Sequence, residues 1–253
     1  MKNLEFLRKT PIAHRGLFDK KDGIPENSLP AFERAIAGKY PIELDVHLLE
    51  DGKLVVFHDD DLNRMTGVKK KIKDCTYEEI KELKLGDTPY GIPLFSEVLE
   101  LVNGRVPLLI ELKYDRKAGE TEKALVELLE NYQGEYAVQS FSPNSLLWFK
   151  KYYPEIPRGQ LASDFKEDRM LGVKKFVLKN LYLNFLTSPD FVAYSINSFP
   201  NKRVESFRKT GKLVLGWTVR NNEGLRKASG NCDNFIGENL ETLDMSLFKR
   251  NWK

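Results

Sequence analysis

The chain has 253 residues, of which 41% are hydrophobic and 30% are charged. This is the composition of a globular protein, and it excludes disordered and fibrous chains. The 40 basic and 37 acidic residues leave a net charge of +3, which argues against a nucleic-acid-binding protein, because such proteins need a concentrated basic surface.

Cysteine usage and the N-terminal residues indicate the compartment. Cys75 and Cys232 lie far apart and form no metal-binding pair, which is typical of a reducing environment. The first residues, MKNLEFLRKTP, lack the apolar region of a secretory signal, and no apolar stretch is long enough to span a bilayer. We therefore expect a cytoplasmic protein without stable membrane insertion.

Short apolar runs alternate with amphipathic stretches along the chain. The predicted strands are residues 12–15, 42–47, 108–113, 136–141, 159–162, 191–194, 213–219 and 234–237. The predicted helices are residues 28–37, 117–131, 143–152, 202–209 and 223–228. This alternation is typical of an α/β protein, and eight strands in about 250 residues predict a (β/α)8 barrel. A doubly wound sheet is the alternative, but the Gly-rich turn that usually follows its first strand is missing.

One repeat is longer than the others. Residues 48–93 contain a turn at 50–53, a further strand at 54–57, a polar loop and a helix near 77–83. The turn between two apolar runs predicts a hairpin. We expect this segment to be an insertion after the second strand of a single barrel domain over residues 1–253, folded against the barrel mouth.

Two strands carry acidic residues on one face. In IELDVHL, residues 42–48, strand geometry puts Glu43, Asp45 and His47 on the face opposite the apolar residues, and a barrel would bury that face too. LLIELKY, residues 108–114, adds Glu111 and Lys113. Burying unpaired carboxylates costs several kcal/mol each, and a bound cation is the simplest compensation. Three carboxylates favour Mg²⁺ or Ca²⁺ over zinc or copper. The alternative is that Glu111 pairs with Lys113 while the other two carboxylates are solvated.

Two histidines complete a set suited to phosphoryl transfer. His14 and Arg15 end the first strand, and His58 follows the strand of the insertion. Arginine binds phosphate in bidentate fashion, and histidine titrates near working pH, so the pair could serve as general base and general acid. We interpret His47 as barrel lining.

At this point the motifs resemble the glycerophosphodiester phosphodiesterase family over nearly the whole chain. The HRG and PENS elements appear as His14-Arg15-Gly16 and Pro25-Glu26-Asn27-Ser28, and the E-x-D-V element as Glu43-Leu44-Asp45-Val46. The H-D … R-x-T-G element starts at His58 and reaches Gly67, and the E-x-K strand is Glu111-Leu112-Lys113. The ordered set is specific, although each tripeptide alone is weak.

The resemblance implies a barrel enzyme with a divalent cation on Glu43, Asp45 and Glu111. Mg²⁺ or Ca²⁺ is expected, and Mn²⁺ is also compatible. His14 and His58 would be the acid–base pair, and Arg15 and Lys113 would hold the phosphodiester. Trp217 would wall the glycerol side, with a core aromatic as its alternative interpretation. Glu26 and Asn27 look like support for the site, although an Asn-Ser pair can also start a helix.

The C-terminal part departs from the family pattern. Arg220 replaces an asparagine after W-T-V, and Gly237, Glu238 and Leu240 replace the threonine, aspartate and proline of the last strand motif. The predicted metal and histidine residues lie elsewhere. We hypothesise that Arg220 favours an anionic alcohol group.

The expected reaction is metal-dependent hydrolysis of small glycerophosphodiesters to glycerol 3-phosphate and an alcohol, as part of lipid and glycerol metabolism. Attack by water and attack by a neighbouring substrate hydroxyl, with a cyclic phosphate intermediate, are both open. A lysophospholipase D or a cyclising phospholipase-type activity is the alternative, and it would need an apolar membrane-facing patch, for which Phe185, Leu186 and Phe191 are the candidates. A non-catalytic phosphodiester-binding barrel is disfavoured because every expected ligand and histidine is present.

Overall fold

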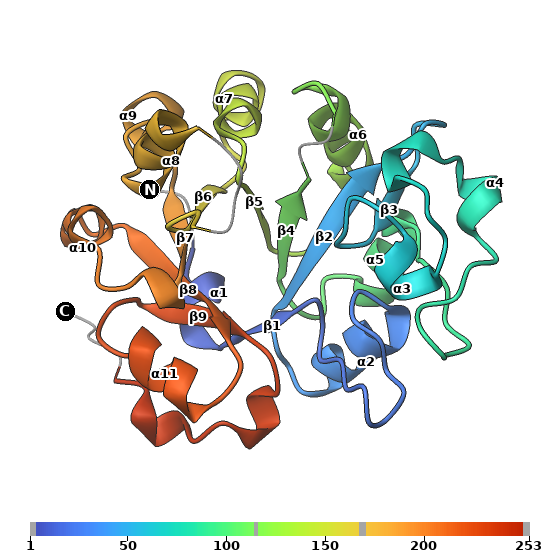
Figure 1. Cartoon of the computed structure of the whole chain (residues 1–253), viewed down its shortest axis with the longest axis horizontal. Helices are drawn as coiled ribbons and strands as arrows, with labels where there is room; N and C mark the ends of the chain where they lie inside the picture. The colour runs from blue at the N-terminus through green and yellow to red at the C-terminus, as the bar shows by residue number, and fades with distance from the viewer. Residues whose placement is uncertain (1–3, 114–115, 167–170, 250–253) are drawn as a thin grey trace. The chain divides into compact units, whose positions relative to one another are not determined.

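The computed structural model describes residues 4–113, 116–166 and 171–249. Two compact units make up the chain: Ala13–Tyr136, and Met1–Ile12 together with Ala137–Lys253. Each of the eight predicted strands is present within one residue of its predicted bounds, and the fold is the predicted (β/α)8 barrel with one further strand outside it. Figure 1 shows the helices alternating with the strands along the chain.

The unit Ala13–Tyr136 contains the acidic strands. Parallel strands β1 (Ile12–His14), β2 (Ile42–Leu48) and β4 (Leu108–Leu112) lie with β2 between the other two. Apolar residues alternate along β2 and β4, and every residue of both strands is buried, as expected for barrel strands covered on both faces. The helices of this unit are α2 (Leu29–Ala37), α3 (Asn63–Thr66), α4 (Tyr77–Ile80), α5 (Phe95–Val102) and α6 (Glu120–Leu129), with a 3₁₀ turn at Ile72–Asp74.

The insertion after β2 is confirmed and has an apolar core of its own. Strand β3 (Leu54–Val56) pairs with β2 in antiparallel fashion, as the predicted hairpin requires. Buried residues of the insertion then pack together: Leu49, Val55, Phe57, Leu62, Ile72, Cys75, Ile80, Leu85 and Ile92. The helix predicted near residues 77–83 ends earlier, at Ile80.

The other unit carries the remaining parallel strands, each paired with the next in chain order from β5 to β9: β5 (Tyr136–Ser140), β6 (Arg158–Ala162), β7 (Phe191–Ser195), β8 (Leu213–Val219) and β9 (Asn234–Gly237). Its helices are α1 (Phe6–Lys9), α7 (Pro143–Tyr152), α8 (Gly172–Lys179), α9 (Asn184–Thr187), α10 (Lys202–Lys209) and α11 (Asn222–Ala228), and 3₁₀ turns lie at Ile196–Ser198, Leu240–Thr242 and Met245–Leu247. Asn234 donates to the carbonyls of Leu7 and Thr10, which ties α1 to β9.

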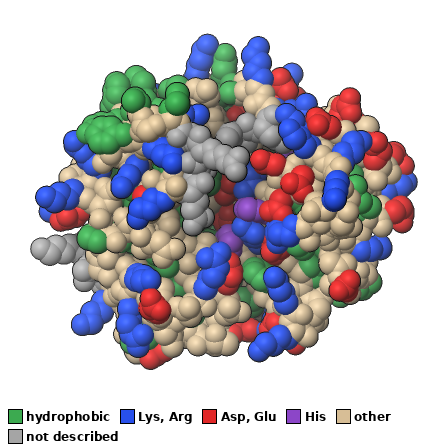
Figure 2. Space-filling view, in the orientation of Figure 1, with side chains coloured by type: hydrophobic (Ala, Val, Ile, Leu, Met, Phe, Trp, Pro, Cys, Tyr) green, Lys and Arg blue, Asp and Glu red, His purple; other side chains and the backbone are tan. Residues whose placement is uncertain are grey.

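The sequence had suggested that Phe191 belongs to an apolar surface patch. This prediction is wrong. The Phe191 side chain is fully buried in β7, because Gly159 of β6 leaves room for the ring and a Cβ there would lie 2.1 Å from it. Phe185 and Leu186 are exposed, as that interpretation requires. Figure 2 shows hydrophobic side chains gathered over α8 and α9, whereas charged side chains are scattered over the rest of this face.

Candidate active site

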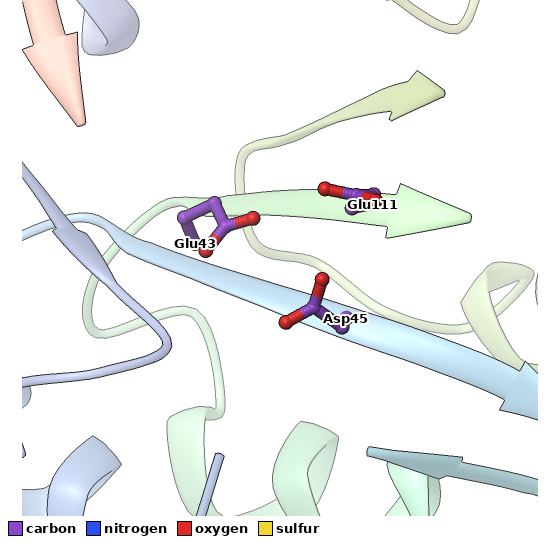
Figure 3. A group of neighbouring side chains, drawn as sticks. All are labelled: Glu43, Asp45 and Glu111. Atoms are coloured by element: carbon purple, nitrogen blue, oxygen red, sulfur yellow. The ribbon is translucent and has the colours of Figure 1, made fainter. Parts of the chain in front are cut away.

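Three buried carboxylates converge between β2 and β4. Glu43 and Asp45 are two residues apart on β2, so they share a face, and the register sets Asp45 opposite Glu111. One oxygen of each carboxylate lies within 4.8 Å of the others, and the three side chains point into one space (Figure 3). Strand alternation thus produces the predicted acidic cluster.

The cluster carries negative charge that burial makes costly. Burial, followed by the charges of Asp45 and Glu111, raises the pKa of Glu43 well above its usual value. Burial opposes ionisation of Asp45 as well, but the positive charge of Lys113, with those of His58 and Arg15, holds the pKa of Asp45 well below its usual range. A set of three close oxygen donors with this charge fits a divalent cation.

Lys113 contacts two members of the cluster. Its Nζ lies 2.6 Å from Glu111 Oε1 and 2.7 Å from Asp45 Oδ1. The Glu111–Lys113 pair that the sequence offered as an alternative therefore exists. The second half of that alternative is wrong, because Glu43 and Asp45 are almost completely buried and not solvated at a strand end.

The chain reverses sharply after β1, and this positions Arg15. Arg15 has a left-handed φ of 55°, and its backbone N–H donates to Glu43 Oε2 at 3.0 Å. Its guanidinium donates to Glu26 at 2.6 Å and lies 3.6 Å from Asp45. Gly16 follows with φ +80°, and a Cβ there would lie 2.9 Å from side-chain atoms of Ala31 and Phe32. The glycine of the HRG motif is therefore required by conformation and by space.

The histidines occupy different environments. His14 is the last residue of β1, is buried, and lies opposite Glu43 in the strand register. His58 is 34% exposed, and its Nδ1 lies 2.6 Å from Asp59 Oδ1. His47 is fully buried, with Nε2 3.3 Å from the His58 carbonyl oxygen, in keeping with its interpretation as lining.

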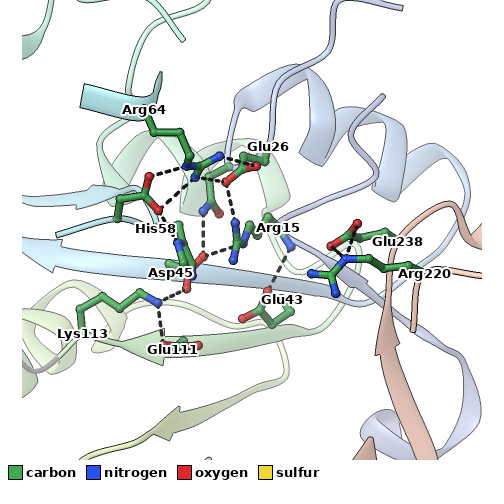
Figure 4. A network of polar contacts seen from close by, with 12 residues as sticks. Arg15, Glu26, Glu43, Asp45, His58, Arg64, Glu111, Lys113, Arg220 and Glu238 are labelled. Carbon is green, nitrogen blue, oxygen red and sulfur yellow. Dashed lines mark hydrogen bonds and ion pairs between the residues drawn. The ribbon is translucent and has the colours of Figure 1, made fainter. Parts of the chain in front are cut away.

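In the sequence, Arg64 and Asp59 stand out only as parts of the H-D … R-x-T-G element. The structure gives them specific contacts. Arg64 donates to Asp59 and, at 2.7 Å, to Glu26, so it links His58 to the carboxylate that holds Arg15 (Figure 4). Although burial opposes ionisation, hydrogen bonds from Arg64 and the charge of Arg15 lower the pKa of Glu26. No composition or periodicity signal marks these contacts, which join Arg64 to residues 5 and 38 positions away.

The PENS element has two separable tasks. Ser28 caps α2, because its hydroxyl accepts from the Ala31 N–H, as the helix-start interpretation predicts. Asn27 has φ +53°, and its side-chain amide donates to Asp45 Oδ2 at 2.8 Å. Asn27 therefore contacts the acidic cluster directly, as expected of a residue that supports the site.

Trp217 lies on β8, in the other compact unit. The departures from the family pattern follow β8, at Arg220, or lie at and after the end of β9, at Gly237, Glu238 and Leu240. The Trp217 ring packs edge-on against Phe141, with centroids 5.6 Å apart, and it is partly exposed. Arg220 and Glu238 pair with each other, with Arg220 Nε 3.0 and 3.1 Å from the two carboxylate oxygens (Figure 4). Two of the departures thus compensate each other's charge.

Comparison with known proteins decides the family. The sequence profile of the glycerophosphoryl diester phosphodiesterase family matches residues 14–242. The chain belongs to this family. A glycerophosphodiester phosphodiesterase of Caldanaerobacter subterraneus is 34% identical over 247 residues, which cover 92% of this chain and 95% of the relative. One from Bacillus altitudinis is 40% identical over 189 residues, 68% of this chain and 74% of the relative.

A solved structure of the family adds the fold and a ligand. It is an Oleispira antarctica phosphodiesterase in complex with the product sn-glycerol-3-phosphate, and it is 26% identical with a TM-score of 0.77, covering 91% of this chain and 93% of its own. Members of the family are phosphodiesterases, and this chain is a glycerophosphodiester phosphodiesterase by family.

In the described part of the chain, no helix has both the length and the apolar character needed to cross a bilayer.

Proposed function

We propose that this enzyme hydrolyses glycerophosphodiesters to sn-glycerol 3-phosphate and an alcohol, with a divalent cation and a pair of histidines. The observation that carries the proposal is the buried convergence of Glu43, Asp45 and Glu111 in the unit that also holds His14, Arg15 and His58. The activity of the two named relatives and the product bound to the Oleispira antarctica phosphodiesterase support this substrate class.

The three carboxylates are the proposed cation ligands, and Mg²⁺, Ca²⁺ or Mn²⁺ suits an all-oxygen donor set. A cation bound there would stabilise negative charge on the phosphoryl oxygens. It would also relieve the repulsion that raises the pKa of Glu43.

Arg15 and Lys113 are the proposed phosphate-binding residues. Glu26 and Asp45 hold the Arg15 guanidinium in a fixed direction. Substrate binding therefore costs little conformational entropy of this side chain. Burial disfavours the charge on Lys113, but Asp45 and Glu111 outweigh burial and raise the pKa of Lys113, so it stays cationic at neutral pH. Two fixed positive charges would stabilise the charge that develops on the phosphoryl group.

The histidines are proposed to move the proton. One imidazole accepts the proton of the attacking hydroxyl as the new P–O bond forms, and the other donates a proton to the alcohol oxygen as the old P–O bond breaks. At His58, the ring Nδ1–H donates to Asp59 Oδ1, which leaves Nε2 to exchange a proton with the substrate. The attacking hydroxyl is that of water or of the substrate's own glycerol, the latter through a cyclic phosphate.

Two further assignments complete the proposal. Trp217 lines the glycerol side of the substrate, which suits its partly exposed ring. Residues 1–253 act as one catalytic domain on a small-molecule substrate.

The direct test measures glycerol 3-phosphate release from glycerophosphocholine by chelated protein, with and without added Mg²⁺, Ca²⁺ or Mn²⁺. Release only with a cation supports both the reaction and the three-carboxylate site. Equal release in the chelated sample contradicts the metal requirement, and no release from folded protein with any cation contradicts the proposed substrate class.

A further inference from the structure

Helices α8 and α9 expose an unusual amount of apolar surface. Half of the twelve exposed large hydrophobic side chains among the described residues lie in this short stretch: Leu171, Val173, Phe176, Tyr182, Phe185 and Leu186. Leu171, Val173 and Phe185 are each more than three-quarters exposed, and α8 has no buried residue. Figure 2 shows these helices as the place where hydrophobic side chains gather on this face. A gathering of exposed apolar side chains of this kind is typical of an interaction surface.

The charged side chains of residues 171–188 all have the same sign. Residues 171–188 contain three lysines, Lys174, Lys175 and Lys179, and no aspartate or glutamate. Lys150 of α7 donates to the Leu186 carbonyl at 2.6 Å and to Ser188 at 2.9 Å, which fixes a further cation at the edge of α9.

A basic hollow adjoins the apolar face. It has a volume of about 530 Å³, and Tyr182 contributes to its wall. Among the described residues that line it, the cationic ones are Lys166, Lys179, Lys202 and Arg203. The acidic one is Asp164, which pairs with Lys166 at 2.8 Å. Arg203 packs over the Tyr182 ring, 5.0 Å from the centroid, so positive charge directly borders the exposed apolar side chains.

We propose that the α8–α9 face docks on the surface of an anionic lipid bilayer. The apolar side chains would enter the boundary between headgroups and acyl chains, and the lysines around them would meet lipid phosphates, which is the arrangement of interfacial amphipathic helices. A second copy of the chain is a poorer occupant, because like-charged rims would face each other. The docking does not depend on the hydrolytic reaction.

The test is co-sedimentation of the chelated full-length protein with vesicles, so that no hydrolysis takes part. One set of vesicles is pure phosphatidylcholine, and the other also contains phosphatidylglycerol. We expect strong binding to the anionic set alone, lost at high salt because the charges are screened. The double variant Phe176→Ser/Phe185→Ser should lower the partition coefficient for the anionic vesicles at least about tenfold. The double variant Lys174→Ala/Lys175→Ala should lower it about fivefold for each lysine removed.

Matched variants control for exposure and charge elsewhere. Leu128→Ser removes an exposed apolar side chain from α6, and Lys20→Ala/Lys21→Ala removes two exposed lysines. Both control variants should bind vesicles as strongly as the unmodified protein. Unchanged turnover of glycerophosphocholine verifies the fold of every variant. Absence of binding to the anionic vesicles at low salt would overturn the proposal and leave the face to a protein partner. Equal binding of the unmodified protein to both lipid compositions would also overturn it. The proposal would likewise fail if the Phe176→Ser/Phe185→Ser variant bound the anionic vesicles as strongly as the unmodified protein.

Discussion

The two candidate catalytic histidines differ in exposure and in what orients them. His58 is about one-third exposed, and Asp59 contacts its Nδ1, whereas His14 is buried at the end of β1. Asp59 is itself held by Arg64. The orientation of the exposed histidine therefore depends on a neighbouring ion pair, while burial restricts the other.

Removing the His58 imidazole should lower turnover. His58→Ala should lower kcat for glycerophosphocholine by about 10²–10⁴, the usual contribution of general acid–base catalysis. Asp59→Asn should lower kcat less and leave KM nearly unchanged, because the imidazole remains but loses its orientation. Asp60→Asn, at the exposed carboxylate next in the chain, is the control. Turnover of His58→Ala close to that of the unmodified enzyme would remove this residue from the mechanism.

The same carboxylate makes stability depend on acid. Partial burial opposes ionisation of Asp59, but hydrogen bonds from His58 and Arg64 outweigh it and lower the pKa of Asp59 in the folded protein. A carboxyl whose pKa is lower folded than unfolded stabilises the fold above its unfolded pKa of about 4, and this contribution is lost as the pH falls further. Urea unfolding should therefore show a stability advantage over Asp59→Asn at pH 7 that shrinks below about pH 4. An advantage independent of pH would contradict the assignment.

At the scale of elements, the strands and the acidic cluster followed from the sequence, and the contacts around Arg15 did not. Alternation on β2 and β4 is enough to bring three carboxylates together. The link from Arg15 to Glu26 and Asn27 depends on left-handed conformations at Arg15 and Asn27, which no periodicity encodes. The helix predicted over 117–131 starts later, at Glu120, because Gly119 precedes it with φ +107°. Helix α8 escaped prediction because it has no buried stripe for a periodicity argument to detect.

The turn after β1 offers a matched pair of glycine substitutions. Gly16→Ala meets both a left-handed φ and neighbouring atoms at 2.9 Å, whereas Gly23→Ala has φ +66° in open space. Backbone strain alone costs about 1 kcal/mol, and overpacking adds about 1–3 kcal/mol. Denaturant unfolding should therefore show the larger loss for Gly16→Ala, together with reduced turnover because Arg15 shifts. Equal losses at the two positions would show that packing against α2 contributes nothing.

The Arg220–Glu238 pair connects the ends of β8 and β9, and it allows the specificity hypothesis to be tested. If Arg220 favours an anionic alcohol, Arg220→Ala should lower kcat/KM for glycerophosphoinositol more than for glycerophosphocholine. Glu238→Gln should do the opposite, because it leaves the guanidinium uncompensated. Kinetics on both substrates that are unchanged in Arg220→Ala would contradict the hypothesis.

At the scale of the whole molecule, a cation bound by the three carboxylates would couple ligand binding to stability. Binding to the folded state alone raises the melting temperature, so Mg²⁺, Ca²⁺ or Mn²⁺ should stabilise the chelated protein. Glu43→Gln should abolish that rise. The chelated variant should nevertheless melt no lower than the chelated unmodified protein, because a neutral amide replaces a carboxyl whose ionisation is opposed by burial and by the charges of Asp45 and Glu111. Glu33→Gln, at an exposed carboxylate of α2, is the control. A full cation-dependent rise in Glu43→Gln would exclude Glu43 as a ligand.

The insertion after β2 supplies His58, Asp59 and Arg64, and it packs around its own apolar core. The acidic cluster and Arg15 belong to barrel strands and the turn after β1. A segment with a separate small core opens at lower free energy than the strands it leaves. Heat or mild denaturant should therefore abolish activity before the barrel melts, through an inactive state that keeps the barrel strands and the acidic cluster but has lost the contacts of His58, Asp59 and Arg64.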